Sequence, residues 1–242
     1  MRKGLALVLL LVALLAAPLA QAQPESGEGC GPEKRSLRDR DLAFAAYARG
    51  SVRAYTAPGR EVLRTFARLN PNEVRTVFGV LAVRRDPSCL ASWYQVQLPM
   101  RPNGSVGWVK ADDVALEPVR TRVQVDLSAQ RVSLFRNGRL VFRTIAGTGA
   151  RETPTPTGHY YVNQRFRVLD PAGSFGPAAI GISAFSPVLQ DWAQGGPIAI
   201  HGTNEPSSVG RAASHGCLRV RNHVARRLLW ATATGSPVVI RA

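Results

Sequence analysis

A cysteine and a histidine, two residue types able to carry out acyl transfer, lie close together near the C-terminal end of the sequence. His201 begins a segment that ends at Asn222, and Cys217 closes the tetrad Ser214-His215-Gly216-Cys217 within it. A thiol is mostly protonated at neutral pH, and a neighbouring imidazole can accept its proton or stabilise the thiolate. Gly216 has no side chain and lets a reacting backbone come close. The segment therefore predicts nucleophilic acyl transfer.

Two short stretches of the sequence are predicted to position these side chains. Residues 197–200, Pro-Ile-Ala-Ile, predict an apolar strand that ends at His201. Residues 218–221, Leu-Arg-Val-Arg, alternate apolar and basic side chains, which is typical of a half-buried strand. We therefore expect Cys217 and His201 at neighbouring strand ends.

The C-terminal stretch predicts one helix and a final strand. Asn222 is suited to N-cap a helix over 223–233, with Val224, Leu228 and Leu229 on its apolar face. Gly235 predicts the end of that helix, and residues 237–240, Pro-Val-Val-Ile, predict a strand.

A zinc site is an alternative use of the same side chains. His201, His215, Cys217 and His223 could ligate zinc, but their spacings fit no usual zinc motif and one thiol is a small set of soft ligands. We expect no metal and no cofactor. His159, the remaining histidine, receives no functional assignment.

The sequence has three cysteines, an odd number. In an oxidising compartment two of them can pair and one stays free. Cys30 and Cys89 lie outside the segment described above, so the simplest pairing joins them and leaves Cys217 as a thiol. This count supports a reactive Cys217 independently of the motif.

The N-terminal residues predict export from the cytoplasm. Arg2 and Lys3 are followed by an apolar run over 5–15 and by Ala20-Gln21-Ala22, a small-x-small cleavage site, so residues 1–22 read as a signal peptide. The alternative is an uncleaved membrane anchor, although the run is short for a span of roughly 20 residues. We expect a secreted, periplasmic or cell-wall-associated protein, with residues 23–46 as a flexible N-terminal segment.

The net charge of +15 is carried almost entirely by arginine and favours anionic surroundings. Outside the cytoplasm these are wall polymers and lipid headgroups; the alternative is that arginine-rich coding bias produced the charge. No basic run is interleaved with aromatic residues in the manner of a nucleic-acid-binding protein. We expect no nucleic-acid partner, and we expect a monomer.

Residues 47–117 predict a small β-barrel. Short β-rich runs at 52–55, 74–83, 93–98 and 107–109 are separated by turn signals such as Pro102-Asn103-Gly104. The segment from Trp93 to Val114 resembles bacterial SH3-like domains, in which a strand ends in a Gly-Trp-Val step. That resemblance implies a wall-binding or spacing domain, whereas Trp93, Tyr94 and Trp108 could equally be plain barrel core.

A second β-rich pattern begins after residues 117–120 and runs over 121–242. Its strongest local signal is Asn137-Gly138 between two β runs, which predicts a hairpin. Residues 159–162 predict a further strand. Residues 169–196 are rich in Gly, Pro and Ala and predict a long loop region with short strands, of the kind that often covers a substrate.

Residues 121–242 resemble the L,D-transpeptidase catalytic domain, also called the YkuD domain. The resemblance includes the hairpin and the Thr-Pro-Thr-Pro-Thr-Gly loop at 153–158. Its most specific part is His-Gly-Thr at 201–203, followed by Ser-His-Gly-Cys-Leu-Arg at 214–219 and Asn222. It implies a mainly β protein, with a β-sandwich and one capping helix after the SH3-like barrel. Such enzymes cross-link peptidoglycan stem peptides without a metal or cofactor.

The resemblance also implies roles for individual residues. Cys217 would be the nucleophile, His201 the proton donor and acceptor, and the carbonyl of Gly202 would orient the imidazole. The backbone around His215, Gly216 and Cys217 would form the oxyanion hole. Arg219 would bind the anionic donor stem, with Ser214, Thr203 and Asn222 as further substrate-binding residues. Val224 departs from the family, because many members carry an acidic residue there.

These observations favour a peptidoglycan L,D-transpeptidase that releases D-Ala. One alternative is an L,D-carboxypeptidase, in which water replaces the acceptor amine. The other is a non-catalytic wall-binding protein in which the SH3-like domain dominates, although the presence of both Cys217 and His201 argues against it.

Overall fold

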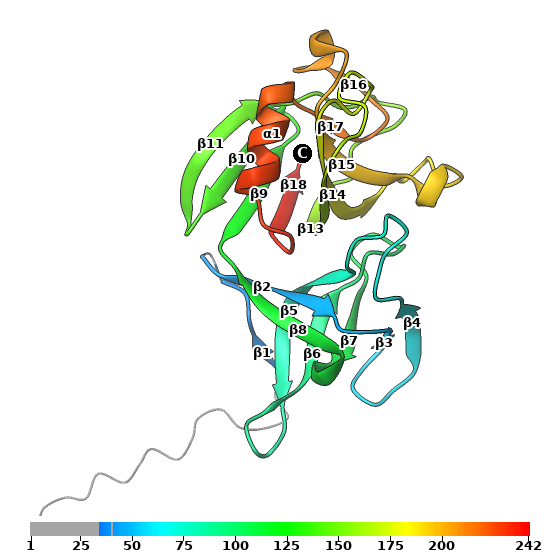
Figure 1. The fold of residues 1–242 in the computed structure, drawn as a ribbon, viewed down its shortest axis with the longest axis vertical. Coiled ribbons are helices and arrows are strands. Elements are labelled where there is room, and N and C mark those ends of the chain that lie inside the picture. The colour runs from blue at the N-terminus through cyan, green and yellow to red at the C-terminus, as the bar shows by residue number, and fades with distance from the viewer. Residues whose placement is uncertain (1–33, 40) are drawn as a thin grey trace, which may run out of the picture.

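A computed structural model describes residues 34–39 and 41–242 and shows a mainly β protein (Figure 1). The predicted signal peptide, residues 23–33 and Cys30 lie outside these residues. Cys89 is disulfide-bonded and Cys217 is a free cysteine. None of the helices in the described part of the chain has the length and apolar character that a membrane span requires.

The first half of the chain folds into one sheet of eight strands with the order β4-β3-β7-β6-β5-β2-β8, and β1 pairs with β5. A short 3-10 helix, Ala111–Asp113, precedes the last strand. The strands are β1 (Arg35–Ser36), β2 (Ala43–Ala48), β3 (Val52–Tyr55), β4 (Val62–Phe66), β5 (Val77–Arg85), β6 (Ala91–Gln97), β7 (Val106–Lys110) and β8 (Val114–Val119).

This first sheet curls around an apolar core of its own, which includes Phe78, Val96, Leu98 and Val109. It begins earlier than the sequence predicted, because β1 and the first four residues of β2 lie in the segment 23–46 that we expected to be flexible. Strand β2 pairs with β5 on one side and β8 on the other. The assignment of this first sheet to the SH3-like class stays a prediction.

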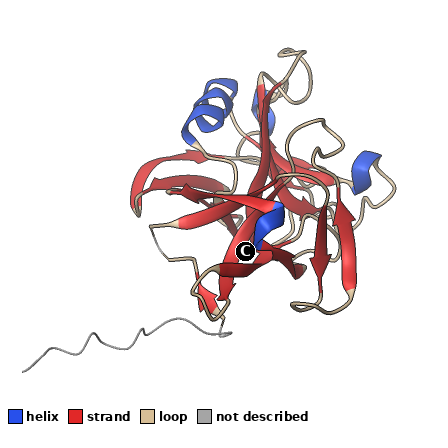
Figure 2. Ribbon diagram, turned by 60° about the horizontal axis from the view of Figure 1, so that its bottom comes forward, coloured by secondary structure: helices blue, strands red, loops and turns tan. Residues whose placement is uncertain are grey.

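The second half of the chain forms another eight-stranded sheet, with the order β11-β10-β9-β18-β13-β14-β15-β17, and a separate pair, β12-β16. The strands are β9 (Thr121–Asp126), β10 (Arg131–Arg136), β11 (Arg139–Ile145), β12 (Thr148–Gly149), β13 (Gly158–Arg167), β14 (Ala178–Phe185), β15 (Pro197–His201), β16 (Ala212–Ser214), β17 (Leu218–Arg219) and β18 (Pro237–Arg241). Two 3-10 helices, Ala193–Gly195 and Pro206–Ser208, and helix α1 (Asn222–Ala231) complete it (Figure 2).

The second sheet is folded over so that its two halves enclose a common core. The long strand β13 pairs with β18 on one side and β14 on the other, and so joins the halves. Helix α1 packs into the same core through Ala225, Leu228 and Leu229 (Figure 1). This arrangement is the predicted β-sandwich with one helix.

Local predictions for this half are confirmed in part. Asn137 and Gly138 connect β10 and β11 and both have positive φ, as a tight hairpin turn requires. The region 169–196 was predicted as a long loop with short strands, and it is mostly loop, but Ala178–Phe185 forms a full strand of eight residues within it. Nearly all its side chains are buried on both faces, so it lacks the alternation by which a half-buried strand is recognised.

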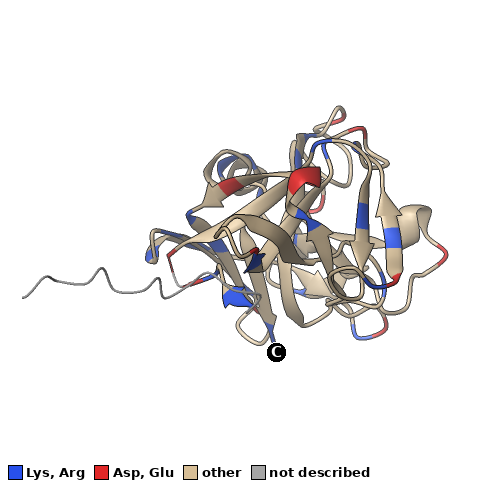
Figure 3. Cartoon of the chain, turned by 90° about the horizontal axis from the view of Figure 1, so that it is seen from below, with Lys and Arg blue, Asp and Glu red and all other residues tan. Residues whose placement is uncertain are grey.

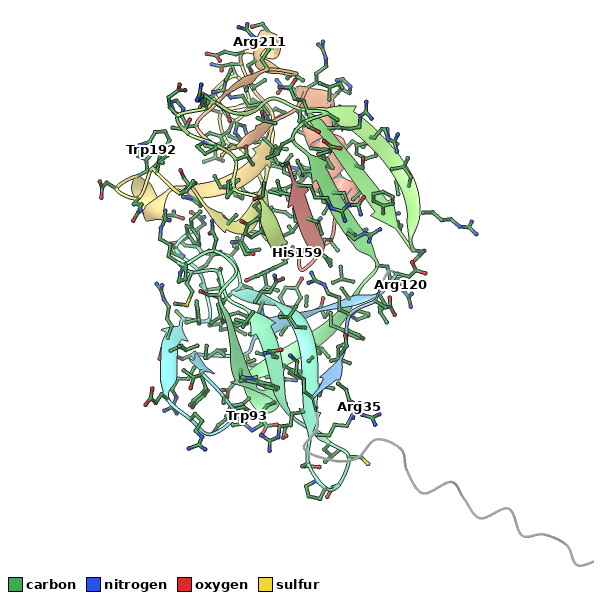
Figure 4. The ribbon with its side chains drawn as sticks, turned by 180° about the vertical axis from the view of Figure 1, so that it is seen from behind. Arg35, Trp93, Arg120, His159, Trp192 and Arg211 are labelled. Carbon is green, nitrogen blue, oxygen red and sulfur yellow. The ribbon has the colours of Figure 1, made fainter. Side chains whose placement is uncertain are left out.

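The two sheets pack directly against each other. Tyr161 of β13 is fully buried, and its hydroxyl donates a hydrogen bond to the carbonyl of Val77 (2.9 Å). Its ring lies against Gly79, where a Cβ atom would approach within 2.9 Å. Gln97 also donates to the carbonyl of His159 (2.8 Å), which Figure 4 shows at the junction. Basic residues are spread over both sheets rather than gathered on one (Figure 3).

Candidate active site

His201 is the last residue of β15 and is buried, with 5% of its surface exposed. Its Nδ1 lies 2.5 Å from the carbonyl oxygen of Gly202. A carbonyl only accepts hydrogen bonds, so Nδ1 carries the proton and Nε2 keeps a free lone pair. The imidazole is therefore oriented as a proton acceptor.

Cys217 directly precedes β17, which pairs in parallel with β15. In this register Ile200 faces Leu218 and His201 faces Arg219. Because side chains alternate along a strand, the side chains of His201, Arg219 and Cys217 emerge on the same face. The Sγ of Cys217 lies 3.9 Å from the carbonyl oxygen of Pro197. The sequence predicted Cys217 and His201 at neighbouring strand ends, and the adjacent parallel strands β15 and β17 provide this arrangement.

Both groups favour their neutral forms. Burial lowers the pKa of His201 to about 4; the positive charge of Arg219 acts in the same direction, and the hydrogen bond to Gly202 opposes it. Burial raises the pKa of the Cys217 thiol, while the N–H of Ala199 and the charge of Arg219 oppose that shift. At neutral pH the site therefore holds a thiol and a neutral imidazole, not a thiolate–imidazolium pair.

The turn that carries Cys217 is supported from within and from a neighbouring loop. Ser214 is buried, and its hydroxyl donates to the carbonyl of Cys217 (2.5 Å) and accepts from the N–H of Gly216 (3.2 Å). Thr155 donates to the carbonyl of Gly216 (2.9 Å), and Thr153 donates to that of Ser214 (3.0 Å). Ser214 therefore orders the turn, and its predicted place as a substrate-binding residue stays a prediction.

Gly216 itself has a backbone conformation that strongly favours glycine. Its φ is +108°, and an added Cβ atom would lie 2.9 Å from the side chain of Ile198. The N–H of Gly216, one of the predicted oxyanion-hole donors, faces the Ser214 hydroxyl.

Thr203 and Asn222 also form hydrogen bonds within the protein. The side-chain carbonyl of Asn222 accepts a hydrogen bond from the N–H of Thr203 (2.8 Å), and the Thr203 hydroxyl accepts from the N–H of Glu205 (2.9 Å). The prediction that Asn222 caps helix α1 is wrong, since the N-cap is Arg221 and makes no side-chain cap. The position of Asn222 also explains why residue 202 is a glycine, because a Cβ atom on residue 202 would lie 2.4 Å from the Oδ1 of Asn222.

Arg219 reaches an acidic partner that the sequence analysis did not identify. Its Nη1 lies 2.8 Å from Oε2 of Glu205, and the two side chains are 16% and 63% exposed. Its Nε is buried without a hydrogen-bond partner in the described residues. An ion pair with so exposed a carboxylate is weak, so another anion can displace Glu205.

Aromatic rings from two loops cover the two histidines of the site. Phe175, between β13 and β14, has its ring centroid 4.6 Å from that of His201. Trp192, between β14 and β15, lies 5.1 Å from His215, and Figure 4 shows it near the outer end of its loop. The sequence analysis assigned neither ring, although both lie in the region predicted to cover a substrate.

The first sheet holds the loop that carries Trp192. Arg101 donates through one nitrogen to the carbonyls of Ser186 (2.8 Å) and Gly195 (2.7 Å), near the two ends of that loop. Asn103 pairs with the backbone N–H and carbonyl of Phe185 (2.9 and 2.8 Å). Both residues were missed, because nothing local in the sequence indicates contacts about eighty positions away.

The described part of the chain holds no group of metal ligands. Among residues 34–39 and 41–242, no three His, Cys, Asp or Glu side chains are close enough together to hold a metal ion. What the site offers is a thiol and an oriented imidazole on adjacent strands, a set suited to acyl transfer.

Comparison with known proteins agrees with this chemistry. The family model of the L,D-transpeptidase catalytic domain, YkuD, matches residues 120–240. The chain belongs to this family. It is 32% identical over 118 residues to the L,D-transpeptidase YkuD of Bacillus subtilis strain 168, covering 49% of this chain and 64% of that protein. The Bacillus licheniformis protein of the same name is 29% identical over 153 residues, with 60% and 85% covered.

Solved structures of the family show partial similarity to the chain. An L,D-transpeptidase from Mycobacterium smegmatis is 14% identical with a TM-score of 0.44, and the match covers 83% of this chain and 99% of that one. A mutant Enterococcus faecium L,D-transpeptidase is 23% identical with a TM-score of 0.39, and the match covers 50% and 49%.

Proposed function

We propose that this protein is a peptidoglycan L,D-transpeptidase that cross-links stem peptides through a thioester on Cys217 and releases D-Ala. The observation that carries the proposal is the parallel register of β15 and β17. It brings a free cysteine and a buried, oriented histidine to the same face of adjacent strands.

Acylation begins from the neutral pair. The Cys217 sulfur attacks the carbonyl of the L-centred third residue of a tetrapeptide stem, and the thiol proton moves to Nε2 of His201. The backbone N–H groups of His215 and Cys217 are proposed to stabilise the oxyanion, each worth roughly 3 kcal/mol, and the N–H of Gly216 could join them only by leaving the Ser214 hydroxyl. The tetrahedral intermediate then loses D-Ala, whose nitrogen takes the proton from His201 as the C–N bond breaks.

The second half-reaction reverses these roles. The amine of an acceptor stem attacks the thioester carbonyl and gives its proton to His201. As the C–S bond breaks, that proton returns to the sulfur, so the enzyme is restored and one amide replaces another. Because its pKa is lowered to about 4, the imidazole of His201 is neutral at neutral pH and has a lone pair with which to accept a proton.

Arg219 is proposed to bind the anionic part of the donor stem. Its weak pair with the exposed Glu205 keeps the guanidinium in place, and a substrate carboxylate would replace Glu205. His215 lies two residues before the nucleophile, and its ring contacts that of Trp192. Ser214, Thr203 and Asn222 are proposed to act indirectly, by ordering the backbone around the two reacting side chains.

The substrate places this activity outside the cytoplasm, consistent with the predicted signal peptide and the strongly basic composition. Peptidoglycan stems are the proposed partners, and anionic wall polymers are a second class of contact that the charge favours. A disulfide at Cys89 also fits an oxidising compartment.

The decisive experiment incubates the purified protein with tetrapeptide muropeptides in one reaction and with a carbapenem in a separate one. We expect cross-linked dimers, and a mass increase of one carbapenem that the Cys217→Ala variant lacks. Tripeptide monomers without dimers would instead identify an L,D-carboxypeptidase. If the Cys217→Ala variant matched the parent on isolated cell walls, the protein would be a wall-binding protein and the enzymatic proposal would be wrong.

A further inference from the structure

A cleft of about 770 Å³ lies between the two sheets, a volume typical of ligand sites. One wall comes from β4 and the turn after it, including Phe66, Ala67 and Asn72. The other comes from the second sheet and ends at Pro197. Pro197 joins this end of the cleft to the site, because its carbonyl oxygen lies 3.9 Å from the Cys217 sulfur, although Cys217 itself does not line the cleft.

Side-chain amides dominate the polar part of the cleft. Gln164 accepts hydrogen bonds from Asn70 (3.1 Å) and Asn72 (2.9 Å), and Gln194 donates to Asn72 (2.8 Å). The Oδ1 of Asn163, another lining residue, is buried and has no hydrogen-bond partner in the described residues. Amides both donate and accept, so this wall suits a ligand with many neutral hydroxyl and amide groups.

The remaining lining residues favour a ligand with apolar faces and no required charge. Phe66, Leu69 and Phe185 supply apolar surface, and the lining includes no Asp or Glu. Of its two arginines, Arg101 is already bound to two carbonyls and Arg64 lies over the Phe66 ring, 5.6 Å from its centroid. A stem peptide carries several carboxylates, and among the described residues of the lining only Arg64 is an arginine without a hydrogen bond or ion pair, which makes the peptide the poorer match.

We propose that this cleft binds the N-acetylated glycan strand to which the donor stem is attached. Sugar rings have apolar faces for the aromatic and aliphatic wall, and hydroxyl and acetamido groups for the amide wall. The position beside Pro197 lets one polymer occupy the cleft while its stem reaches Cys217. The choice of ligand rests on the proposed function, but the binding test does not require catalysis.

The first experiment measures binding of a tetrasaccharide of N-acetylglucosamine to the full chain by NMR titration. We expect binding by the parent and by the Cys217→Ala variant alike, so loss of the enzymatic proposal would leave this result intact. Ala67→Trp fills the cleft from an exposed position and should weaken binding at least tenfold. Val62→Trp, on strand β4, which ends just before Ala67, lies outside the cleft; it is the matched control and should bind as the parent does.

A second experiment compares turnover of glycan-linked stems with turnover of free stem peptides. The parent should prefer linked stems, Ala67→Trp should lower that ratio several-fold, and Val62→Trp should keep it. Thr65→Trp, at the same wall, replaces Ala67→Trp if the latter fails to fold. Absence of tetrasaccharide binding by the parent would overturn the proposal. So would unchanged binding by a folded cleft variant, or displacement of the sugar by a free stem peptide.

Discussion

The polar side chains of the two sheets have different partners. In the second sheet they order the backbone of the proposed reaction site, and in the first half of the chain they hold the loop beside that site. In the second sheet, strand register brings Cys217 and His201 together, and side chains such as Ser214 and Asn222 are committed to ordering the backbone around them. In the first half of the chain, Arg101 and Asn103, in the turn between β6 and β7, bind the loop that carries Trp192. The second sheet is proposed to position the reacting atoms, and the first sheet positions the Trp192 loop next to them.

The largest effect should come from the histidine of the second sheet. His201→Gln removes the proton acceptor, and we expect kcat/KM to fall about a thousandfold, within the range for loss of a general acid-base group. The measurement is the rate of thioester formation with a tetrapeptide stem. Alkylation of Cys217 by iodoacetamide at high pH should persist, which would show that the thiol is still accessible. A loss below tenfold would contradict the assignment.

Much of this second sheet could be predicted from local sequence, because its decisive signals are local. The tetrad ending at Cys217, the strand ending at His201 and the Asn137-Gly138 turn all lie where the pattern places them. The strand Ala178–Phe185 was missed because burial on both faces removes the alternating pattern.

Contacts across the fold could not be predicted, and they account for the other errors. Asn222 has the right type for a helix cap, but the approach of Thr203 gives its side chain a different partner. Glu205, Phe175 and Trp192 likewise acquire their partners only when loops fold over the strand ends. Residue type and spacing thus predict which groups react, whereas the contacts that orient and cover these groups depend on tertiary structure.

Acid should weaken the fold through the same histidine. The pKa of His201 in the folded protein, about 4, lies below its ordinary value of 6.5, so the unfolded chain binds a proton more readily between these values. Stability is therefore fully present above pH 6.5 and falls as the pH drops towards 4, by about 3 kcal/mol from this group. Urea unfolding at pH 7 and pH 4 measures it.

His201→Gln is the control for this pH effect as well. Because exposed carboxylates contribute equally to both proteins, the difference between their pH profiles isolates His201. Identical profiles would mean that the imidazole is not buried in its neutral form.

A smaller effect tests whether the two sheets share one core. Gly79→Ala places a methyl group against the buried ring of Tyr161, and such overpacking costs about 1–3 kcal/mol. We expect one cooperative unfolding transition at lower urea concentration, reported equally by both sheets. Gly50→Ala is the matched control, since open space surrounds that position and stability should change little. Separate transitions for the two sheets would show that they are energetically independent.

The smallest effect concerns the bonds from the first sheet to the Trp192 loop. Arg101→Ala removes both hydrogen bonds to that loop while leaving Cys217 and His201 in place. We expect about a tenfold loss in acylation rate, equivalent to roughly 1.4 kcal/mol, because the cover over His215 becomes less ordered.

Hydrogen exchange distinguishes this positioning role from general destabilisation. Exchange should increase over residues 186–196 and stay unchanged in β15 and β17, whereas global loosening would raise all three. Arg53→Ala removes an exposed arginine from the same sheet and should leave both the rate and the exchange as in the parent. If Arg101→Ala also acylates at the parent rate, the first sheet does not control access, and its contribution is limited to the core that it shares with Tyr161.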